Sequence, residues 1–106
     1  MFTTIRQYRC DPADAVEIAH RADEHFADAL SRQPGFVAYE LIDCGDGDLF
    51  TLTVFTDRAS AERSSALAAD FIREQLSDKE LTRTGAHTGE VLVNRAMQDV
   101  LEMVHA

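Results

Sequence analysis

The chain has 106 residues and a formal net charge of −9, with 45% hydrophobic residues, five glycines and two prolines. This length suits a single domain that buries one ordinary core. The apolar runs are too short to cross a membrane, which requires about 18 residues. The acidic charge repels nucleic-acid phosphates and anionic lipid, so we expect neither nucleic acid nor a membrane as a partner.

Sequence motifs for metal and nucleotide binding are lacking. The chain has no CxxC, HExxH, GxGxxG or GxxxxGK[ST] pattern, and its four histidines lack metal-ligand spacing. We therefore expect no metal and no bound cofactor. Cys10 and Cys44 occur without a recognisable secretory leader, which predicts reduced thiols and a cytoplasmic protein.

The N-terminal third predicts a strand followed by a helix. Residues 2–9 are rich in β-branched and aromatic types, which favours a strand. Asp11 then supplies an N-cap and Pro12 the first position of a helix over about 12–33, which Pro34-Gly35 ends. The apolar stripe of this helix comprises Ala15, Ile18, Ala19, Ala22, Phe26, Ala29 and Leu30.

The middle of the chain predicts a β-hairpin. Strands over 36–43 and 49–56 flank a turn rich in glycine and aspartate. The second strand is apolar on both faces, so it requires cover on both sides. Two helices can cover only one face, and the other cover must come from elsewhere. The apolar residues are Leu49 and Phe55 on one face, and Phe50, Leu52 and Val54 on the other.

The last part predicts a helix, a loop and a short strand. Asp57 supplies the predicted N-cap of a helix over about 58–77. Residues 78–89 are polar and predict a loop, and 90–94 predict the last strand. Apolar spacing predicts a C-terminal helix at about 96–104. The inward stripe of the helix over 58–77 comprises Ala61, Ser64, Ser65, Ala68, Phe71, Ile72 and Leu76.

The order β-α-β-β-α-β predicts an α+β domain of the ferredoxin-like, split βαβ type that spans 1–106. We expect a four-stranded antiparallel sheet in the order 4-1-3-2, with two helices on one face. The stripes of both helices carry many alanines and serines. Such slim helices either lie close to the sheet or leave a pocket above it.

Residues 34–41, Pro-Gly-Phe-Val-Ala-Tyr-Glu-Leu, resemble a segment of the antibiotic biosynthesis monooxygenase family of dimeric α+β barrels. The resemblance extends over about residues 2–95. It includes Tyr8-Arg9, Asp11-Pro12, Val54-Phe55-Thr56-Asp57 and Gly89-Glu90-Val91-Leu92-Val93. It implies a homodimer with two sheets packed face to face, and a pocket between sheet and helices in each subunit.

Members of this family include cofactor-free oxygenases of quinol-like polycyclic substrates, haem-degrading enzymes and isomerases. The chain departs from them at two places: Phe55 stands where many members carry a tryptophan, and Ser64 where many carry a histidine. Haem degradation is not expected, because the chain has no tryptophan.

Three residues are candidates for catalysis. Tyr39 and Glu40 are strand neighbours and must point to opposite faces, so one faces the pocket. A buried tyrosine can orient a phenolic substrate, and a buried glutamate can act as a base. The alternative is a packing tyrosine, with Glu40 paired to Arg6. His25 lies at the edge of the apolar stripe of the first helix. Its side chain either points into the mouth of the pocket or has no function at the border between the buried and exposed faces of the helix.

The expected pocket residues are Arg6, Phe55, Ser64, Ser65 and Phe71. Two functions remain open. The first is a small cofactor-independent monooxygenase acting on a quinol or polyketide-like aromatic substrate. The second is a non-catalytic homodimer of the same fold that binds a ligand or serves a structural role. Whether the chain is an enzyme is not decided by its sequence, and the departures at Phe55 and Ser64 favour the second function.

Overall fold

The computed structural model describes residues 1–96. Its four strands form one antiparallel sheet in the order β2-β3-β1-β4, which is the predicted order read from the other edge. The strands are β1 (Phe2–Cys10), β2 (Phe36–Asp43), β3 (Asp48–Phe55) and β4 (Leu81–Glu90). The predicted C-terminal helix at about 96–104 lies, beyond its first residue, outside the described residues.

The first helical segment is continuous but not uniform. It begins as a single turn, η1 (Pro12–Asp14), capped by the Asp11 side chain, which accepts from the Ala13 amide at 3.0 Å. It continues as α1 (Ala15–Arg21), widens into a π-helical turn, η2 (Ala22–Ala27), and ends as α2 (Asp28–Ser31). The predicted helix is confirmed, whereas the wide turn is a feature that the apolar spacing does not reveal.

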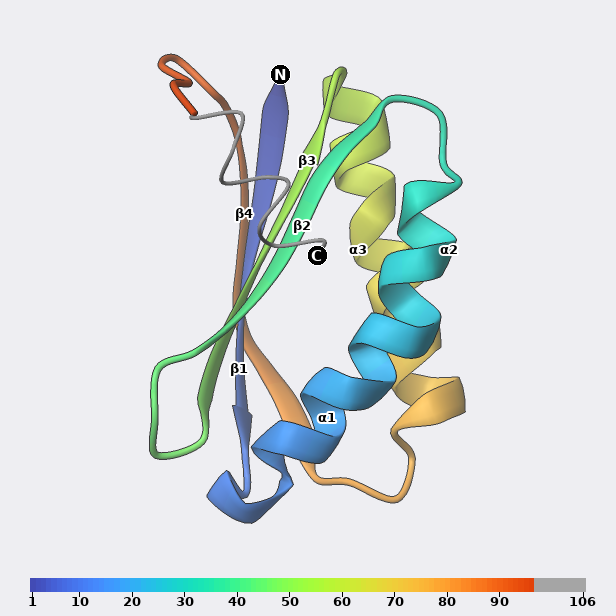
Figure 1. Ribbon diagram of the computed structural model, residues 1–106, viewed down its shortest axis with the longest axis vertical. Coiled ribbons are helices and arrows are strands. Elements are labelled where there is room, and N and C mark those ends of the chain that lie inside the picture. Colours follow the sequence, from blue (N-terminus) through green and yellow to red (C-terminus); the bar gives the residue numbers. More distant parts are fainter. Residues whose placement is uncertain (97–106) are drawn as a thin grey trace.

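The second helix, α3 (Arg58–Gln75), begins at the predicted N-cap. The Asp57 carboxylate accepts from the Ser60 amide at 2.9 Å. Both helical segments cover the same face of the sheet (Figure 1). The core between them consists of two clusters. One is built on Tyr8, Ile18, Leu49 and Leu76, and the other on Phe26, Leu30, Phe55 and Ala68.

The position of the last strand was predicted wrongly. β4 covers Leu81–Glu90, most of the segment expected to be a loop, and residues 91–94 form no strand. A strand is held by backbone hydrogen bonds, which any side chain permits. β4 pairs with β1 from Leu81 opposite Cys10 to Glu90 opposite Phe2. As an edge strand it buries little, so its polar sequence gives no hydrophobic signal.

The other face of the sheet carries no helix among residues 1–96 (Figure 1). β3 alternates as expected for a strand with two apolar faces. Its residues at alternate positions from Leu49 to Phe55 are buried under the helices, whereas Phe50, Leu52 and Val54 are only half-buried on the open face. On that face Ile5 lies opposite Leu52.

Candidate functional site

A buried arginine lies at the centre of the helix-covered face of the sheet. Arg6 is on β1, one of the two central strands, and its side chain is 0% exposed. Its Nη1 donates to Ser64 Oγ at 3.1 Å and to Ser65 Oγ at 3.2 Å, both on α3. Its Nη2 donates to Thr53 Oγ1 on β3 at 2.7 Å. Arg6 therefore ties the sheet to α3 through neutral hydroxyls.

No carboxylate forms an ion pair with Arg6 within residues 1–96. The alternative pairing of Arg6 with Glu40 is wrong, because Glu40 is exposed on the opposite face of the sheet. Burial lowers the pKa of the Arg6 guanidinium, and the nearby Arg83 lowers that pKa further. An arginine nonetheless stays protonated in a protein, so the site holds a buried positive charge.

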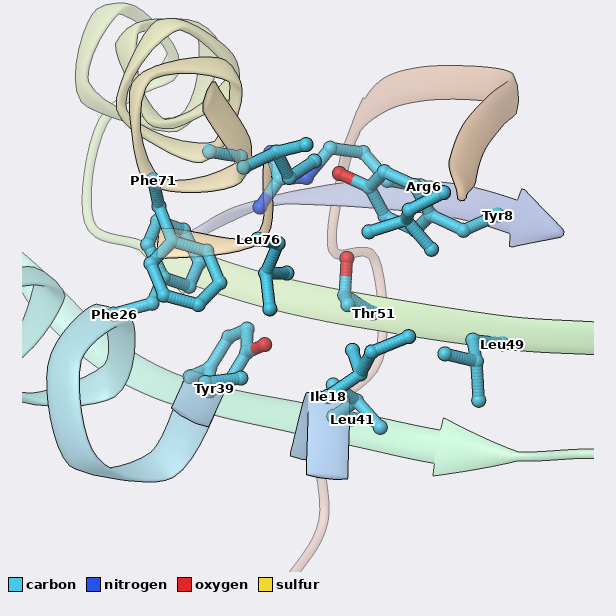
Figure 2. Close-up of a pocket in the computed structure, with 14 residues that line it drawn as sticks. Arg6, Tyr8, Ile18, Phe26, Tyr39, Leu41, Leu49, Thr51, Phe71 and Leu76 are labelled. Carbon is cyan, nitrogen blue, oxygen red and sulfur yellow. The ribbon is translucent and has the colours of Figure 1, made fainter. Parts of the chain in front are cut away.

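A cavity of about 30 Å³ lies beside Arg6, between the sheet and the two helices. Most of its wall is apolar, and Phe26 and Phe71 stack there with ring centres 5.3 Å apart. Figure 2 shows the Tyr39 and Thr51 hydroxyls within the space that the lining side chains surround. The lining residues are Arg6, Tyr8, Ile18, Ala22, Phe26, Tyr39, Leu41, Leu49, Thr51, Ala68, Phe71, Ile72, Leu76 and Leu81.

The cavity beside Arg6 is smaller than the expected aromatic pocket. A space of about 30 Å³ takes one or two waters, whereas an apolar cavity known to bind benzene measures about 150 Å³. A second, open hollow of about 230 Å³ adjoins it and is lined by Ala19, Ala22, Asp23, Tyr39 and Leu41. We call this hollow the outer groove. It shares Ala22, Tyr39 and Leu41 with the cavity, so the room for a ring lies at the cavity mouth.

The wide turn η2 shapes both spaces. It places Ala22 and Phe26 on the cavity and Asp23 on the outer groove. Single π-helical turns inside longer helices occur frequently at functional sites. Ala22, which carries only a methyl group, lines both spaces beside Tyr39.

Tyr39 stands between the two spaces. Its ring meets Phe26 edge-on, with centres 5.3 Å apart. Burial raises the pKa of the Tyr39 phenol, and the positive charge of Arg6 opposes this shift only in part. Tyr39 is therefore a neutral hydroxyl near neutral pH, suited to donating a hydrogen bond and not to acting as a base.

The predicted site residues divide into three groups. Arg6, Tyr39 and Phe71 line the cavity. Ser64 and Ser65 do not line it but hold Arg6 in place. His25, Glu40 and Phe55 lie elsewhere: His25 is exposed on η2, Glu40 is on the open face, and Phe55 is buried in the core against Phe36. Glu40 cannot face the cavity, because its strand neighbour Tyr39 does.

Among the residues that the site prediction missed, four carry polar side chains in or beside the site. Tyr8 and Thr51 line the cavity, and Asp23 lines the outer groove. Arg83, on β4, lies over the Tyr8 ring at 5.6 Å and donates to the Tyr8 hydroxyl at 3.3 Å. Thr51 was detectable, since it alternates with Leu49 on the helix-covered face. Arg83 was not, because its segment was predicted to be a loop.

Residues 1–96 contain no cluster of three His, Cys, Asp or Glu side chains that are placed to hold a metal. None of the helices in this part of the chain has the length and apolar character required to cross a membrane.

The fold has many counterparts among solved structures. SnoaB, a cofactor-independent oxygenase from Streptomyces nogalater, superposes with a TM-score of 0.60 at 20% identity, covering 88% of this chain and 94% of SnoaB. A predicted antibiotic biosynthesis monooxygenase from Chloroflexus aurantiacus superposes with a TM-score of 0.66 at 14% identity, covering 90% and 96% of the two chains. The fold is antibiotic biosynthesis monooxygenase-like.

A dimeric ferredoxin-like protein from an uncultured marine organism has the same architecture, with a TM-score of 0.66 at 9% identity, covering 91% of this chain and 98% of that protein. No family model matches the sequence. No curated protein matches it significantly either. At these identities the antibiotic biosynthesis monooxygenase-like fold is shown, and the chemistry has to be argued from the site.

Proposed function

We propose that this protein is a cofactor-independent monooxygenase acting on a polycyclic quinol-like or polyketide-like aromatic substrate. The observation that carries the proposal is the aromatic-lined space around Tyr39. It has an outer part with room for a ring and a narrow inner part beside a buried positive charge. The antibiotic biosynthesis monooxygenase-like fold, shared with the oxygenase SnoaB, supports it.

The reaction needs no external reductant. An activated ring CH₂ group reacts with O₂ so that a carbonyl replaces its two hydrogens. One oxygen atom enters the carbonyl, and the other leaves as water with those hydrogens. The substrate supplies all four electrons. The protein contributes orientation, exclusion of water and removal of the first proton.

The residues at the mouth suit these tasks. Phe26 and Tyr39 offer ring surfaces against which a flat substrate stacks. The neutral Tyr39 hydroxyl orients a substrate oxygen. Asp23 is the carboxylate lining the outer groove, where an exposed base can accept the substrate proton and pass it to water. His25 and Glu40 lie away from both spaces, so we assign them no role.

The test is oxygen uptake by the purified chain with anthrone as the probe, whose activated CH₂ group becomes the carbonyl of anthraquinone. We expect one O₂ consumed per anthraquinone formed, above the rate without protein, and about tenfold slower turnover for Tyr39→Phe. Product formation equal to the protein-free rate, with anthrone and with hydroxylated anthrones, would reject the monooxygenase.

A second function has an observation in its favour. Within residues 1–96, neither a carboxylate nor an imidazole lines the cavity beside Arg6, so its chemistry favours binding over acid–base catalysis. A non-catalytic binding protein of the same fold would bind the aromatic probe without consuming oxygen. The oxygen-uptake assay therefore separates the two functions.

We further propose that the active form is a homodimer joined through the open face of the sheet. Ile5 and Ile42, at 38% and 37% exposed, extend the apolar surface formed by Phe50, Leu52 and Val54. A second copy would bury this surface, which is costly to leave in water. The marine structural neighbour is described as dimeric, which supports this arrangement.

A further inference from the structure

The buried charge of Arg6 is incompletely satisfied. Five N–H groups belong to a guanidinium, and three hydroxyls accept from its two terminal nitrogens. Its Nε is buried and makes no hydrogen bond of good geometry among the described residues, although the Tyr8 hydroxyl lies near enough to the guanidinium to favour its charged form. An unpaired buried donor on a charged group is costly, and native structures rarely leave one without a purpose.

A second buried polar group without a hydrogen-bond partner belongs to a residue that lines the same cavity. Thr51 Oγ1 is also buried and without a hydrogen-bond partner among the described residues. Arg6 and Thr51 both line the small cavity, and they come from adjacent, directly paired positions of β1 and β3. Two unsatisfied polar groups, one of them carrying a full positive charge, therefore lie buried in the wall of one small space.

The local charge is positive although the protein as a whole is acidic. Arg83 lies close enough to Arg6 to lower its pKa, so two guanidinium groups flank Tyr8. No ion pair neutralises either of them within residues 1–96. The facing titratable groups are the Tyr8 hydroxyl and the neutral Tyr39 hydroxyl, with Asp23 further out on the groove.

We propose that the cavity is an oxyanion site, which binds an aromatic ligand in its anionic form. The anionic oxygen lies in the small cavity beside Arg6 and accepts from Arg6 Nε and Thr51 Oγ1, while the ring occupies the outer groove beside Tyr39. The sizes agree: about 30 Å³ admits one or two oxygen atoms, and about 230 Å³ admits a ring. Charge-assisted bonds to a buried guanidinium are strong and select for negative charge.

This inference deepens the proposed function, because the phenolate or enolate oxygen that the substrate carries after it loses its first proton would be held by Arg6 and Thr51. It also holds for a non-catalytic binding protein, since it concerns only the charge of the ligand. A carboxylate offers the same anionic oxygen, so the experiment compares both sources.

The experiment is calorimetric titration of the full chain with two pairs of probes at pH 7.5. The first pair is 2-naphthoate and the neutral, isosteric 2-naphthamide. The second is 4-nitro-1-naphthol, which is ionised at this pH, and its neutral methyl ether. We expect the anion of at least one pair to bind about tenfold or more tightly than its neutral partner.

The deciding variant is Thr51→Val, which removes one orphan hydroxyl and keeps the shape. We expect it to weaken the preferred anion about tenfold, to change the neutral partner less than about twofold, and to leave thermal stability unchanged or higher, because no existing hydrogen bond is lost. Thr82→Val, on an exposed position of β4, is the matched control and should change neither affinity. Where Arg6→Met folds, it should abolish the preference for the anion.

Equal affinity for both members of each pair, or an anion affinity that Thr51→Val leaves intact, would overturn the inference: the two orphan donors would then hold only water. Anion binding without oxygen uptake would support the oxyanion site and reject the monooxygenase. If Thr51→Val leaves anthrone turnover unchanged and both members of each probe pair bind equally, the monooxygenase is supported and the oxyanion site is rejected.

Discussion

Arg6 on β1 and Ser64 on α3 are joined by a hydrogen bond of 3.1 Å between Nη1 and Oγ, with both side chains 0% exposed. The serine also donates to the Ala61 carbonyl of its own helix. A buried charge is thus bound to the helix by a side chain that the helix itself holds in place. This relationship sets the distance between sheet and helix at the point where the cavity begins.

The first prediction concerns this link. Ser64→Ala and Ser65→Ala should each reduce the free energy of unfolding by about 1 kcal/mol, because either remaining hydroxyl still accepts from Arg6 Nη1. The double variant should lose about 1 kcal/mol more than the sum, since Nη1 then has no partner. Urea denaturation of the four proteins measures this. Additive losses would show that the two serines do not share the Arg6 donor.

The second prediction tests the space shared by cavity and groove. Ala22→Leu should weaken binding of the naphthyl probes at least about tenfold, because the larger side chain fills the space that both hollows share. Its stability should fall by only about 1 kcal/mol, as the added methyl groups enter open space. Ala59→Leu, on an exposed position of α3, is the control. Unchanged probe affinity in Ala22→Leu would place the ligand elsewhere.

The third prediction concerns the hairpin turn between β2 and β3. Gly45 and Gly47 both have positive φ, at 88° and 83°. A Cβ at Gly47 would lie 2.1 Å from the Cys10 carbonyl oxygen, whereas a Cβ at Gly45 would meet nothing within 4 Å. Gly45→Ala should cost about 1 kcal/mol for its backbone conformation alone. Gly47→Ala should cost at least about 2 kcal/mol more, measured by thermal unfolding. Equal losses would contradict the close approach.

The fourth prediction tests the proposed dimer. The chain should sediment at about twice its monomer mass of 11.8 kDa at micromolar concentration. Leu52→Arg should shift it to the monomer, because an unpaired charge cannot be buried between two sheets. Val16→Arg, at a residue 81% exposed on α1, is the control and should stay dimeric. If the wild-type chain sediments as a monomer, the proposed dimer interface is wrong.

The fifth prediction concerns acid stability. Arg21 donates to the Asp78 carboxylate at 2.6 and 3.1 Å, which holds the pKa of that carboxyl below its usual range. A lowered pKa in the folded state stabilises the fold above the ordinary pKa, and this contribution is lost as the pH falls through the folded value.

Asp78→Asn should therefore be less stable than wild type at pH 7, and the difference should shrink between about pH 5 and pH 2. Thermal unfolding over this range measures it, with Glu80→Gln as an exposed control on the same loop. A difference that stays constant with pH would mean that the ionised carboxylate contributes nothing to stability.

The sequence alone determined those features of this protein that depend on interactions between residues close together in the chain. The helix boundaries at Asp11 and Asp57, the hairpin turn and the two-faced apolar pattern of β3 follow from side chains that cap, turn or alternate within a few residues. These short-range preferences, together with the β-α-β-β-α-β order, were sufficient to predict the sheet order β2-β3-β1-β4.

Only the tertiary structure decided the extent of β4 and the make-up of the site. β4 is held by backbone pairing with β1, a long-range interaction that leaves no hydrophobic pattern in its own residues. The same pairing brings Arg83 beside Tyr8. The hydrogen-bond partners of Arg6 depend on which strand and helix pack against it. They are the hydroxyls of Thr53 and Ser64, which lie 47 and 58 residues further along the chain. Arg6 and Thr51 become neighbours only when β1 pairs with β3, and their polar atoms lack partners only because the fold buries them. These two unsatisfied groups can therefore be recognised only in the tertiary structure.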